Sequence, residues 1–279
     1  MDRFMIILKR LWKNKAAVLG LATVLFLVSM CVLAPYIVSS DPLKLDIPNR
    51  LKPPSIKYLL GTDQFGRAIL SRLLYGGRLS LGVGIISVGM GLIPGVLLGL
   101  VSGFLRGNVD AAIMRGVDVM MALPSILLAL LIVTVLGPGI VNTMIAIGIG
   151  GIPSMTRLVR GKVLSVRETD YVEAARSIGA SDRRIMLKHI LPNCAAPIIV
   201  VATLRLPSAI IMAASLSFIG LGAQAPTPEW GAMLATGRHF LTTAWWICTF
   251  PGLAIFLSVL GLNLFGDGLR DALDPKLKN

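Results

Sequence analysis

The long stretches of this chain that contain no Asp, Glu, Lys or Arg decide what it can fold into. Five such stretches exceed 20 residues, and they are 16–40, 79–105, 119–156, 206–228 and 240–266. A helix that crosses a membrane needs about 20 predominantly apolar residues, and each stretch is long enough. Only 15% of the residues are charged, against about 25% in typical soluble domains. The sequence therefore predicts an all-α, polytopic membrane protein.

The number of spans depends on how these stretches are divided. Residues 119–156 are long enough for two helices, and Gly137-Pro138-Gly139 is a strong turn signal near their middle. Helices are therefore expected over about 122–136 and 140–155. The fifth span is expected to begin near Ala195. This division predicts six transmembrane helices.

The basic N-terminus followed by an apolar stretch also fits a cleaved signal peptide. That apolar stretch is longer than the 7–15 residues of a signal-peptide core, and no small-x-small cleavage site follows it cleanly. We therefore expect a retained first span within residues 1–40. It would be peripheral to a core of five spans over residues 79–266.

Lys and Arg residues predict the orientation, because they accumulate in cytoplasmic loops. With the N-terminus inside, the inner segments carry 18 of the 27 Lys and Arg residues and the outer segments carry 8, Arg205 being the remaining one. Both termini are therefore expected in the cytoplasm, with external loops at 41–78 and 223–244. Seven cations between Lys44 and Arg78 count against this orientation. We attribute the net charge of +13 to anionic lipid beside the cytoplasmic face rather than to nucleic acid.

The chain lacks the signatures of an enzyme and of an autonomous pump. It has no phosphate-binding loop ending in Gly-Lys-Ser or Gly-Lys-Thr, no His-Glu-x-x-His and only two histidines. Cys31, Cys194 and Cys248 are far apart and show no metal or disulfide spacing. The acidic residues lie mostly in loops, which argues against a carboxylate relay in the membrane. We expect no catalytic, metal or cofactor site on this chain and an energy source elsewhere.

Residues 157–192 form a charge-rich segment that is longer than a simple connector between two spans needs to be. Thr169 and Asp170 can cap a first helix, with Glu173 at the capping-box spacing. Gly179 can then supply the left-handed conformation that ends this helix. The pattern predicts a short helix with a sharp bend at its end.

A second short helix is expected after the bend, capped by Ser181 and stopping before Pro192. Ala174 and Ala175 leave the first helix thin on one side, so the groove of a partner protein can approach its backbone. A surface loop without a partner is one alternative interpretation. A DNA-binding helix-turn-helix is another, disfavoured between membrane spans.

Four separated motifs resemble those of ABC importer permeases of the dipeptide, oligopeptide and nickel family. They are Glu173-Ala174-Ala175 with Gly179 and HILPN at 189–193, GTDQFGR at 61–67 with Ser71-Arg72, LSFIGLG at 216–222 with PTPEWG at 226–231, and GDGLRDALDP at 266–275. The generic permease pattern has isoleucine where this chain has His189, and the histidine form resembles the peptide and nickel branch.

The resemblance implies the ABC type I importer permease fold in a single domain, 1–279, of the C-type subunit. It implies a coupling loop, 157–192, that docks on an ATP-hydrolysing subunit through Tyr171, Glu173, Ala174, Ala175, Ile178, Gly179 and Ala180. It also implies a homologous second permease subunit, two ABC ATPase subunits that bind ATP and Mg²⁺, and an extracytoplasmic solute-binding protein. Such a transporter would import peptides or related small solutes by alternating access across a bacterial or archaeal cytoplasmic membrane.

Three single residues are candidates for the pathway or its outer end. Arg205 lies about ten residues into the fifth span, where an arginine costs about 2.5–3.5 kcal/mol. It either faces a wet cavity, a partner subunit or a carboxylate, or it snorkels to the inner interface. The resembled family often has an acidic residue near Met212, and this chain has none, so we expect a pathway that prefers neutral or anionic groups. Trp230 is either an interfacial anchor or a contact to the outer gate or to the solute-binding protein.

Two patterns in and before the second span concern packing. Gly91, Gly95, Gly99 and Gly103 recur every four residues, a spacing that lets helices approach closely. Residues 69–81 form either a helix on the outer membrane face or a solvated connector.

The alternative function is an autonomous secondary transporter or channel. Such a protein would show inverted repeats or acidic pairs inside the membrane, and the sequence shows neither. A membrane-anchored scaffold is disfavoured by the many glycines and prolines inside the spans.

Overall fold

The structure, a computed structural model, describes residues 3–273. Its longer helices are α2 (Lys15–Val32), α4 (Ile69–Leu105), α5 (Gly107–Met121), α6 (Ser125–Leu136), α7 (Ile140–Arg167), α10 (Leu191–Phe218) and α12 (Trp246–Leu273). Its shorter elements are α1 (Arg3–Lys13), α3 (Ala34–Ile37), η1 (Ile47–Asn49), α8 (Asp170–Ser177), α9 (Asp182–Arg184), the π-helical η2 (Ile185–Ile190), α11 (Trp230–Gly237) and η3 (Arg238–Phe240). Within residues 3–273 the only β-pairing is one isolated bridge, so the predicted all-α class is confirmed.

Each of the six expected spans coincides with a helix, but at most five segments of the described chain meet the length and hydropathy condition for crossing a membrane, and α7 is not among them. α2, α4, α12 and the continuous helix from Asp182 to Phe218 are each long and apolar enough to cross a membrane. α5 and α6 meet that condition only as a pair, bent by 91°. α6 alone has 12 residues, or about 18 Å, which is shorter than a hydrocarbon core of about 30 Å. The bend falls at Pro124, because the residue before a proline disfavours the helical conformation.

The predicted turn at residues 137–139 is confirmed. α6 ends at Leu136 and α7 begins at Ile140. Gly137 and Gly139 have φ angles of 88° and 147°, which glycine adopts without steric cost.

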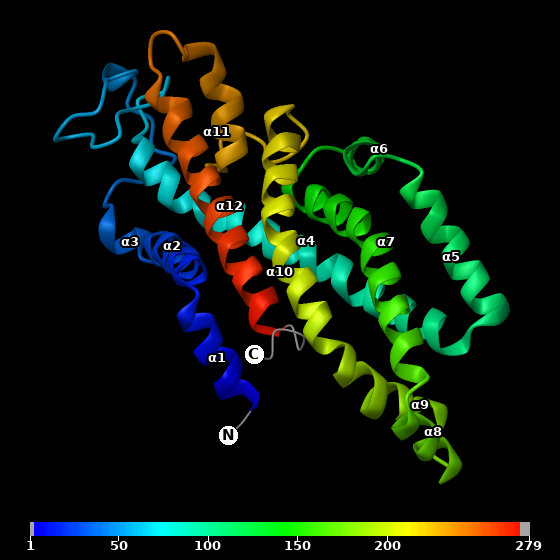
Figure 1. The fold of residues 1–279 in the computed structure, drawn as a ribbon. Helices are drawn as coiled ribbons and strands as arrows, with labels where there is room; N and C mark the ends of the chain where they lie inside the picture. Colours follow the sequence, from blue (N-terminus) through cyan, green and yellow to red (C-terminus); the bar gives the residue numbers. More distant parts are fainter. Residues whose placement is uncertain (1–2, 274–279) are drawn as a thin grey trace.

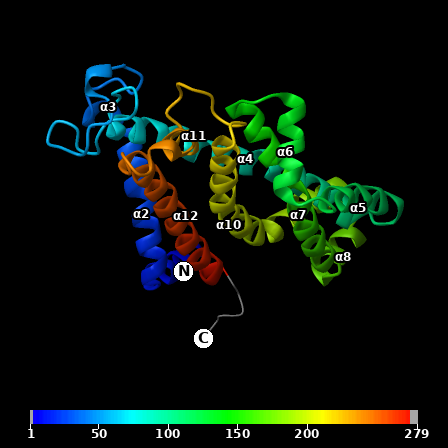
Figure 2. The same ribbon diagram turned by 90° about the horizontal axis from the view of Figure 1, so that it is seen from above.

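Two helix pairs and one joining helix organise the molecule (Figures 1 and 2). α4 packs along α7, and α2 packs along α12. α10 contacts α4, α7 and α12 and therefore joins the two pairs. Seen from above, α2 and α12 lie on one side of α10, and α5, α7 and α8 lie on the other (Figure 2).

The four regularly spaced glycines of α4 face α7 and allow the two backbones to approach closely. A Cβ atom on Gly91 would lie 2.5 Å from the carbonyl oxygen of Gly148, and one on Gly99 would lie 2.7 Å from that of Thr156. No side chain fits at such distances unless a helix moves. The predicted tight packing against a neighbouring span is confirmed, and that neighbour is α7.

Replacing Gly99 with leucine is expected to force α4 away from α7. Overpacking of a well-packed contact typically costs about 1–3 kcal/mol, and here the new atoms would meet backbone. We expect less monodisperse protein after detergent extraction and a lower Tm. Gly89→Leu is the matched control, because it lies on the same helix and a Cβ there meets nothing within 4 Å. Equal Tm values for the two variants would contradict the packing assigned to Gly99.

The polar elements lie toward opposite ends of the bundle. α1, the end of α12 and the α8–α9 region lie toward the lower end in Figure 1, and residues 38–68 with α11 lie toward the upper end. This sorting groups the predicted inner segments together and separates them from the predicted outer ones. Lys276 and Lys278, counted for the orientation, and Asp274-Pro275 of the last motif lie outside the described residues.

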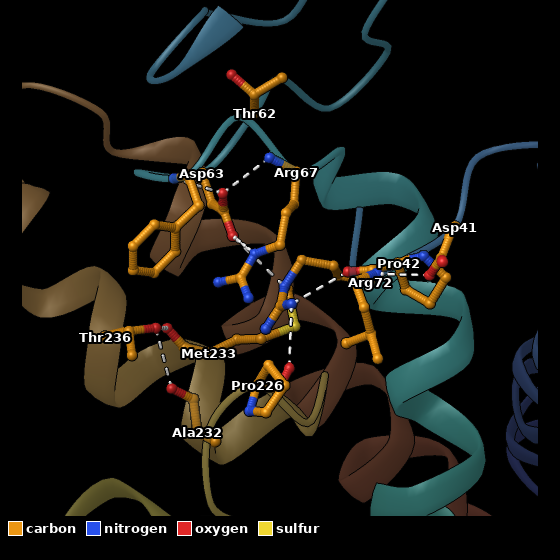
Figure 3. Close-up of polar contacts among 12 residues, drawn as sticks. Asp41, Pro42, Thr62, Asp63, Arg67, Arg72, Pro226, Ala232, Met233 and Thr236 are labelled. Atoms are coloured by element: carbon orange, nitrogen blue, oxygen red, sulfur yellow. Dashed lines mark hydrogen bonds and ion pairs between the residues drawn. The ribbon is translucent and has the colours of Figure 1, made fainter. Parts of the chain in front are cut away.

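A buried carboxylate holds the loop before α4 onto that helix (Figure 3). Asp63 Oδ2 lies 2.6 Å from Arg67 Nε and 3.6 Å from Arg72 Nε. Asp63 Oδ1 accepts hydrogen bonds from two backbone N–H groups of its own turn. Arg72 Nη1 donates to the carbonyls of Pro42, at 3.2 Å, and Pro226, at 3.3 Å. The cluster therefore ties the loop before α4 to the loop before α11.

Three of the seven cations between Lys44 and Arg78, all arginines, contact carboxylates or backbone carbonyls. Arg67 and Arg72 share Asp63. Arg78 donates to two carbonyls at the C-terminal end of α2, at 2.7 and 2.8 Å. A cation at that end satisfies terminal carbonyls and interacts favourably with the helix dipole. These three arginines are therefore weak indicators of orientation, which accounts for part of the cationic excess.

Residues 69–81 are helical, as one of the two interpretations expected, and the solvated-connector interpretation was wrong. They are the start of α4, which continues to Leu105, and the expected external loop 41–78 therefore ends at Ala68. The reason is packing, because Ile69 is buried in a cluster with Trp230 and Trp246.

Candidate functional site

The predicted bend at Gly179 is present. Gly179 has a φ angle of 81°, and its N–H donates to the carbonyl of Arg176 at 3.0 Å. The N–H of Ala180 donates to the carbonyl of Ala175 at 3.1 Å. Together these two bonds form the Schellman motif that ends many helices at a left-handed glycine. α8 is therefore stopped by its local sequence.

One face of α8 is seated on the core of the chain itself. Val172 is buried with Val166 and Ile185 in a cluster that extends along α7 and α10. Ala175 is also buried, and Ala180 packs against the same cluster. The open, thin side expected at both alanines is therefore correct only for Ala174. Ala175 and Ala180 instead pack against the core and hold α8 in place.

The opposite face and the tip of this element are open. The exposed members of the predicted coupling set are Tyr171, Glu173, Ala174, Ile178 and Gly179. Ile178 is 86% exposed, Tyr171 is 44% exposed and Leu187, just beyond the bend, is 46% exposed. Exposed apolar side chains grouped on one small element and rimmed by charge are typical of a protein-binding surface.

The capping box expected at the start of α8 does not form. Thr169 occupies the N-cap position, but its hydroxyl donates to the carbonyl of Val166 at 2.6 Å and accepts nothing from the helix. Only two residues separate α7 from α8, so a carbonyl in the last turn of α7 lies within reach of the hydroxyl and competes for it. Ser181, expected to cap the next helix, also makes no side-chain cap.

Pro192 does not stop the second helix, contrary to expectation. α9, η2 and α10 run continuously from Asp182 to Phe218. In the π turn the N–H of Leu191 donates to the carbonyl of Met186, five residues earlier, and Pro192 falls in the first turn of α10. Asn193 Nδ2 donates to the carbonyl of His189 at 2.7 Å. The backbone is thus rearranged around the proline and the helix continues.

Ion pairs fasten α5 to α7, and no pattern in the sequence indicated them. Arg160 donates through Nε and Nη2 to the two carboxylate oxygens of Asp110, at 2.6 and 2.7 Å. Arg157 pairs with Asp118 at 2.6 Å, and a third pair joins the start of α5 to the end of α7. Partners that lie 39 and 50 residues apart in the chain follow no sequence spacing that could predict them.

A cavity of about 200 Å³ lies between α4, α6, α7 and α10. Arg205 and Met212, the two predicted pathway residues, both line it. A Cβ atom on Gly151 would lie 3.0 Å from Arg205 Nη1, so the guanidinium lies against the bare backbone of α7. Of the two alternatives for Arg205, the geometry supports the one that faces a cavity.

Trp230 is buried, with 1% of its surface exposed, so it is neither an interfacial anchor nor a direct contact for a solute-binding protein. Its indole Nε1 donates to the carbonyl of Leu73 at 2.9 Å. The neighbouring Glu229, 2% exposed, accepts hydrogen bonds from two N–H groups at the start of α11 and from Ser80 Oγ. Together the two side chains fasten α11 to α4. The partners on α4 are about 150 residues away in sequence, which is why the pattern suggested an exposed ring for Trp230.

The titratable groups of the described chain form no metal centre. Between Arg3 and Leu273 there is no group of three or more His, Cys, Asp or Glu side chains placed to hold a metal ion. In the loop before α4, a hydrogen bond from the Asn49 amide, with a weaker one from the Tyr58 hydroxyl, holds the pKa of Asp46 below its ordinary value.

Two family patterns match the sequence. The family described as binding-protein-dependent transport system inner membrane component matches residues 95–279. The N-terminal transmembrane domain of oligopeptide transport permease C matches residues 3–54.

Curated relatives match nearly the whole chain. The di/tripeptide transport system permease protein of Pseudomonas aeruginosa (strain UCBPP-PA14) is 51% identical and covers 98% of this chain and 93% of its own. The dipeptide transport system permease protein of Alkalihalophilus pseudofirmus is 50% identical over 97% of this chain and 89% of its own. The glutathione transport system permease protein of Pectobacterium atrosepticum is 46% identical over 97% of this chain and 90% of its own.

Solved structures with the same fold also exist. An inward-facing crystal form of the MetNI methionine ABC transporter contains a chain that superposes with a TM-score of 0.58 at 21% identity. The match covers 72% of this chain and 96% of that one. At this identity the similarity establishes the fold alone, and the fold agrees with the helix arrangement of Figures 1 and 2.

Proposed function

The chain belongs to the family of binding-protein-dependent transport system inner membrane components, and on this basis we propose that it is one of two membrane subunits of an ATP-driven importer of short peptides. Membership makes it a permease component of an ABC importer, which works with ATPase subunits and a binding protein. The proposal adds a homologous second permease subunit, two ATPase subunits that bind ATP and Mg²⁺, and cytoplasmic N- and C-termini in a bacterial or archaeal cytoplasmic membrane.

The observation that carries the coupling role is the two-faced construction of α8. Val172 and Ala175 are buried and hold the helix on the core. Tyr171, Glu173 and Ile178 are exposed on its other side. An element that only connected two spans would not present an 86% exposed isoleucine at its tip. Glu173 in the first turn of α8 is stabilised by the helix dipole and can pair with an arginine of the ATPase subunit.

In this mechanism the ATPase subunits close on ATP and carry α8 with them. Because α8 shares one apolar cluster with α7 and the base of α10, its displacement reaches both spans. Those two spans, with α4 and α6, line the cavity that contains Arg205 and Met212. Movement of these helices would open the cavity alternately to the two sides of the membrane.

Short peptides are the substrate class that the relatives suggest. Three relatives are named for transport of di/tripeptides, dipeptides and D,D-dipeptides, at 45–51% identity over at least 96% of this chain. The glutathione transport relative, at 46% identity, is named for a substrate that is also a small peptide. A solute with a peptide backbone and a free carboxylate is therefore the best-supported substrate.

Reconstitution tests the proposal. The chain, its neighbouring permease, the ATPase subunits and the binding protein are placed in proteoliposomes, and uptake of a radiolabelled dipeptide is measured. We expect uptake that requires ATP, the binding protein and every subunit. In the same assembly, Ile178→Cys is expected to form a disulfide with a cysteine placed in the ATPase cleft, whereas Ile56→Cys, fully exposed in the external loop, is not.

Dipeptide uptake by this chain alone, without ATP, would contradict the proposal and support an autonomous secondary transporter. Cross-linking from Ile56 but not from Ile178 would reverse the assigned orientation.

A further inference from the structure

We propose that the cavity between α4, α6, α7 and α10 is a subsite for the terminal carboxylate of the transported peptide, with Arg205 as its main ligand. The inference rests on the proposed peptide import and specifies which end of the substrate this chain recognises. It is carried by the position of Arg205, by the groups around it and by the size of the cavity.

Arg205 and two other lining residues share one face of α10. Ser208 and Met212 follow at three and seven positions, the spacing of neighbours along a helix. The facing wall is α7, where Gly151 leaves room for the guanidinium, and α4 contributes Gly91. The arginine therefore projects into a space that small residues keep open.

The guanidinium has no carboxylate partner within the described chain. The five ion pairs between Arg3 and Leu273 involve other arginines, and none includes Arg205. An arginine at this depth is costly, and such residues in membrane proteins are found facing water-filled cavities or a compensating charge. A substrate anion that enters the cavity would supply that charge.

A second polar group points to the same ligand. Ser87 lines the cavity from α4, its residue is 1% exposed, and its Oγ has no hydrogen-bond partner among the described residues. Buried hydroxyls are nearly always hydrogen-bonded, so a partner is expected here. The fork of the Arg205 guanidinium matches the two oxygens of a carboxylate, and the Ser87 hydroxyl, covered in this conformation, would add a donor once its side chain turns into the cavity.

The size of the cavity limits how much of the substrate it holds. Sites that enclose a whole drug-sized ligand span about 300–1,000 Å³, whereas this one is about 200 Å³. The cavity therefore fits one end of a peptide. The rest of the molecule would extend away from the cavity, toward the second permease subunit.

Charged thiol reagents report the electrostatic potential inside the cavity, and the measurement does not require transport. In the assembled transporter, with its three native cysteines replaced by alanine, Ser208→Cys places a thiol one turn from Arg205. Its reaction rates are measured with an anionic and a cationic methanethiosulfonate, and the ratio of the two rates is compared between variants. We expect Arg205→Met to lower the anionic-to-cationic ratio about tenfold, because a unit charge one helical turn away acts strongly in a partly dry site. The control Arg115→Met, an exposed arginine on α5, is expected to leave the ratio unchanged.

Protection by a substrate identifies the group that binds. Glycylglycine is expected to slow labelling of Ser208→Cys, and glycylglycinamide, which lacks the carboxylate, is expected not to. In the Arg205→Met background neither dipeptide should protect.

Three results would overturn the subsite. These are equal protection by the amide, a rate ratio that Arg205→Met does not change, and a ratio in the complete transporter that favours the cationic reagent, which would mean that a partner's acidic side chain already neutralises Arg205. Failure of dipeptide uptake with all subunits present would instead count against the proposed peptide import and would leave the labelling result standing.

Discussion

Replacing Gly179 with valine is expected to reduce peptide uptake at least about tenfold while ATP hydrolysis continues. The bend requires a φ of 81°, and a β-branched residue in such a conformation costs about 1–3 kcal/mol, where 1.4 kcal/mol is a factor of ten. The Schellman turn would relax, and the exposed tip at Ile178 would shift against the ATPase subunit. Both rates are measured in the same proteoliposomes, and the number of peptides taken up per ATP hydrolysed reports the coupling.

Two variants separate backbone strain from side-chain bulk. A Cβ atom at Gly179 meets nothing within 4 Å, so a steric clash is not the expected cause. Gly179→Asn should retain most of the uptake, because asparagine tolerates the left-handed region. Gly161→Val makes the same change at an equally open glycine within α7 and should be nearly silent. If Gly179→Val transports like the wild type, the geometry assigned to the coupling element is wrong.

Replacing Asp63 with asparagine is expected to give the largest loss of stability, about 3–5 kcal/mol, the usual effect of removing one partner from a buried ion pair. The change keeps the side-chain volume, but it can turn an acceptor toward Arg67 Nε into a donor. It also leaves two buried guanidinium groups without a counter-charge. We expect a clearly lower Tm in detergent and faster proteolysis between residues 41 and 68.

Asp41→Asn is the control for this prediction. Asp41 belongs to the same loop and accepts one hydrogen bond, from the N–H of Leu43, but it is exposed. Its replacement should leave the Tm nearly unchanged. Similar Tm values for the two variants would show that the carboxylate of Asp63 does not hold the external loop.

The features that were predicted correctly depend on local signals. The spans follow from charge-free length, and the turn at residues 137–139 and the bend at Gly179 follow from the backbone freedom of glycine. The packing of α4 follows from a four-residue glycine repeat. Each signal lies within one helix turn or one apolar stretch, so no knowledge of distant neighbours was needed.

Some of the missed features depend on which of several nearby partners a group takes, and others depend on partners far away in the chain. Thr169 lost its capping role to the end of α7, and Pro192 was accommodated by a π turn and by the side chain of Asn193. The sequence suggests that Trp230 is a surface aromatic residue, but its ring is covered by α4. Arg67 and Arg72, in and after the loop before α4, are weak indicators of orientation because both contact Asp63.

The unbroken helix from Asp182 to Phe218 has a mechanical consequence. Its 37 residues trace about 55 Å of helix at 1.5 Å per residue, with Pro197 and Pro207 inside it, so a small tilt at one end is amplified at the other. In the proposed importer, such a lever would convert a small movement of the ATPase subunits on one side of the bilayer into an opening on the other. The π turn at its base, where the hydrogen-bond register is already altered, is the joint at which part of that movement is most easily lost to flexing.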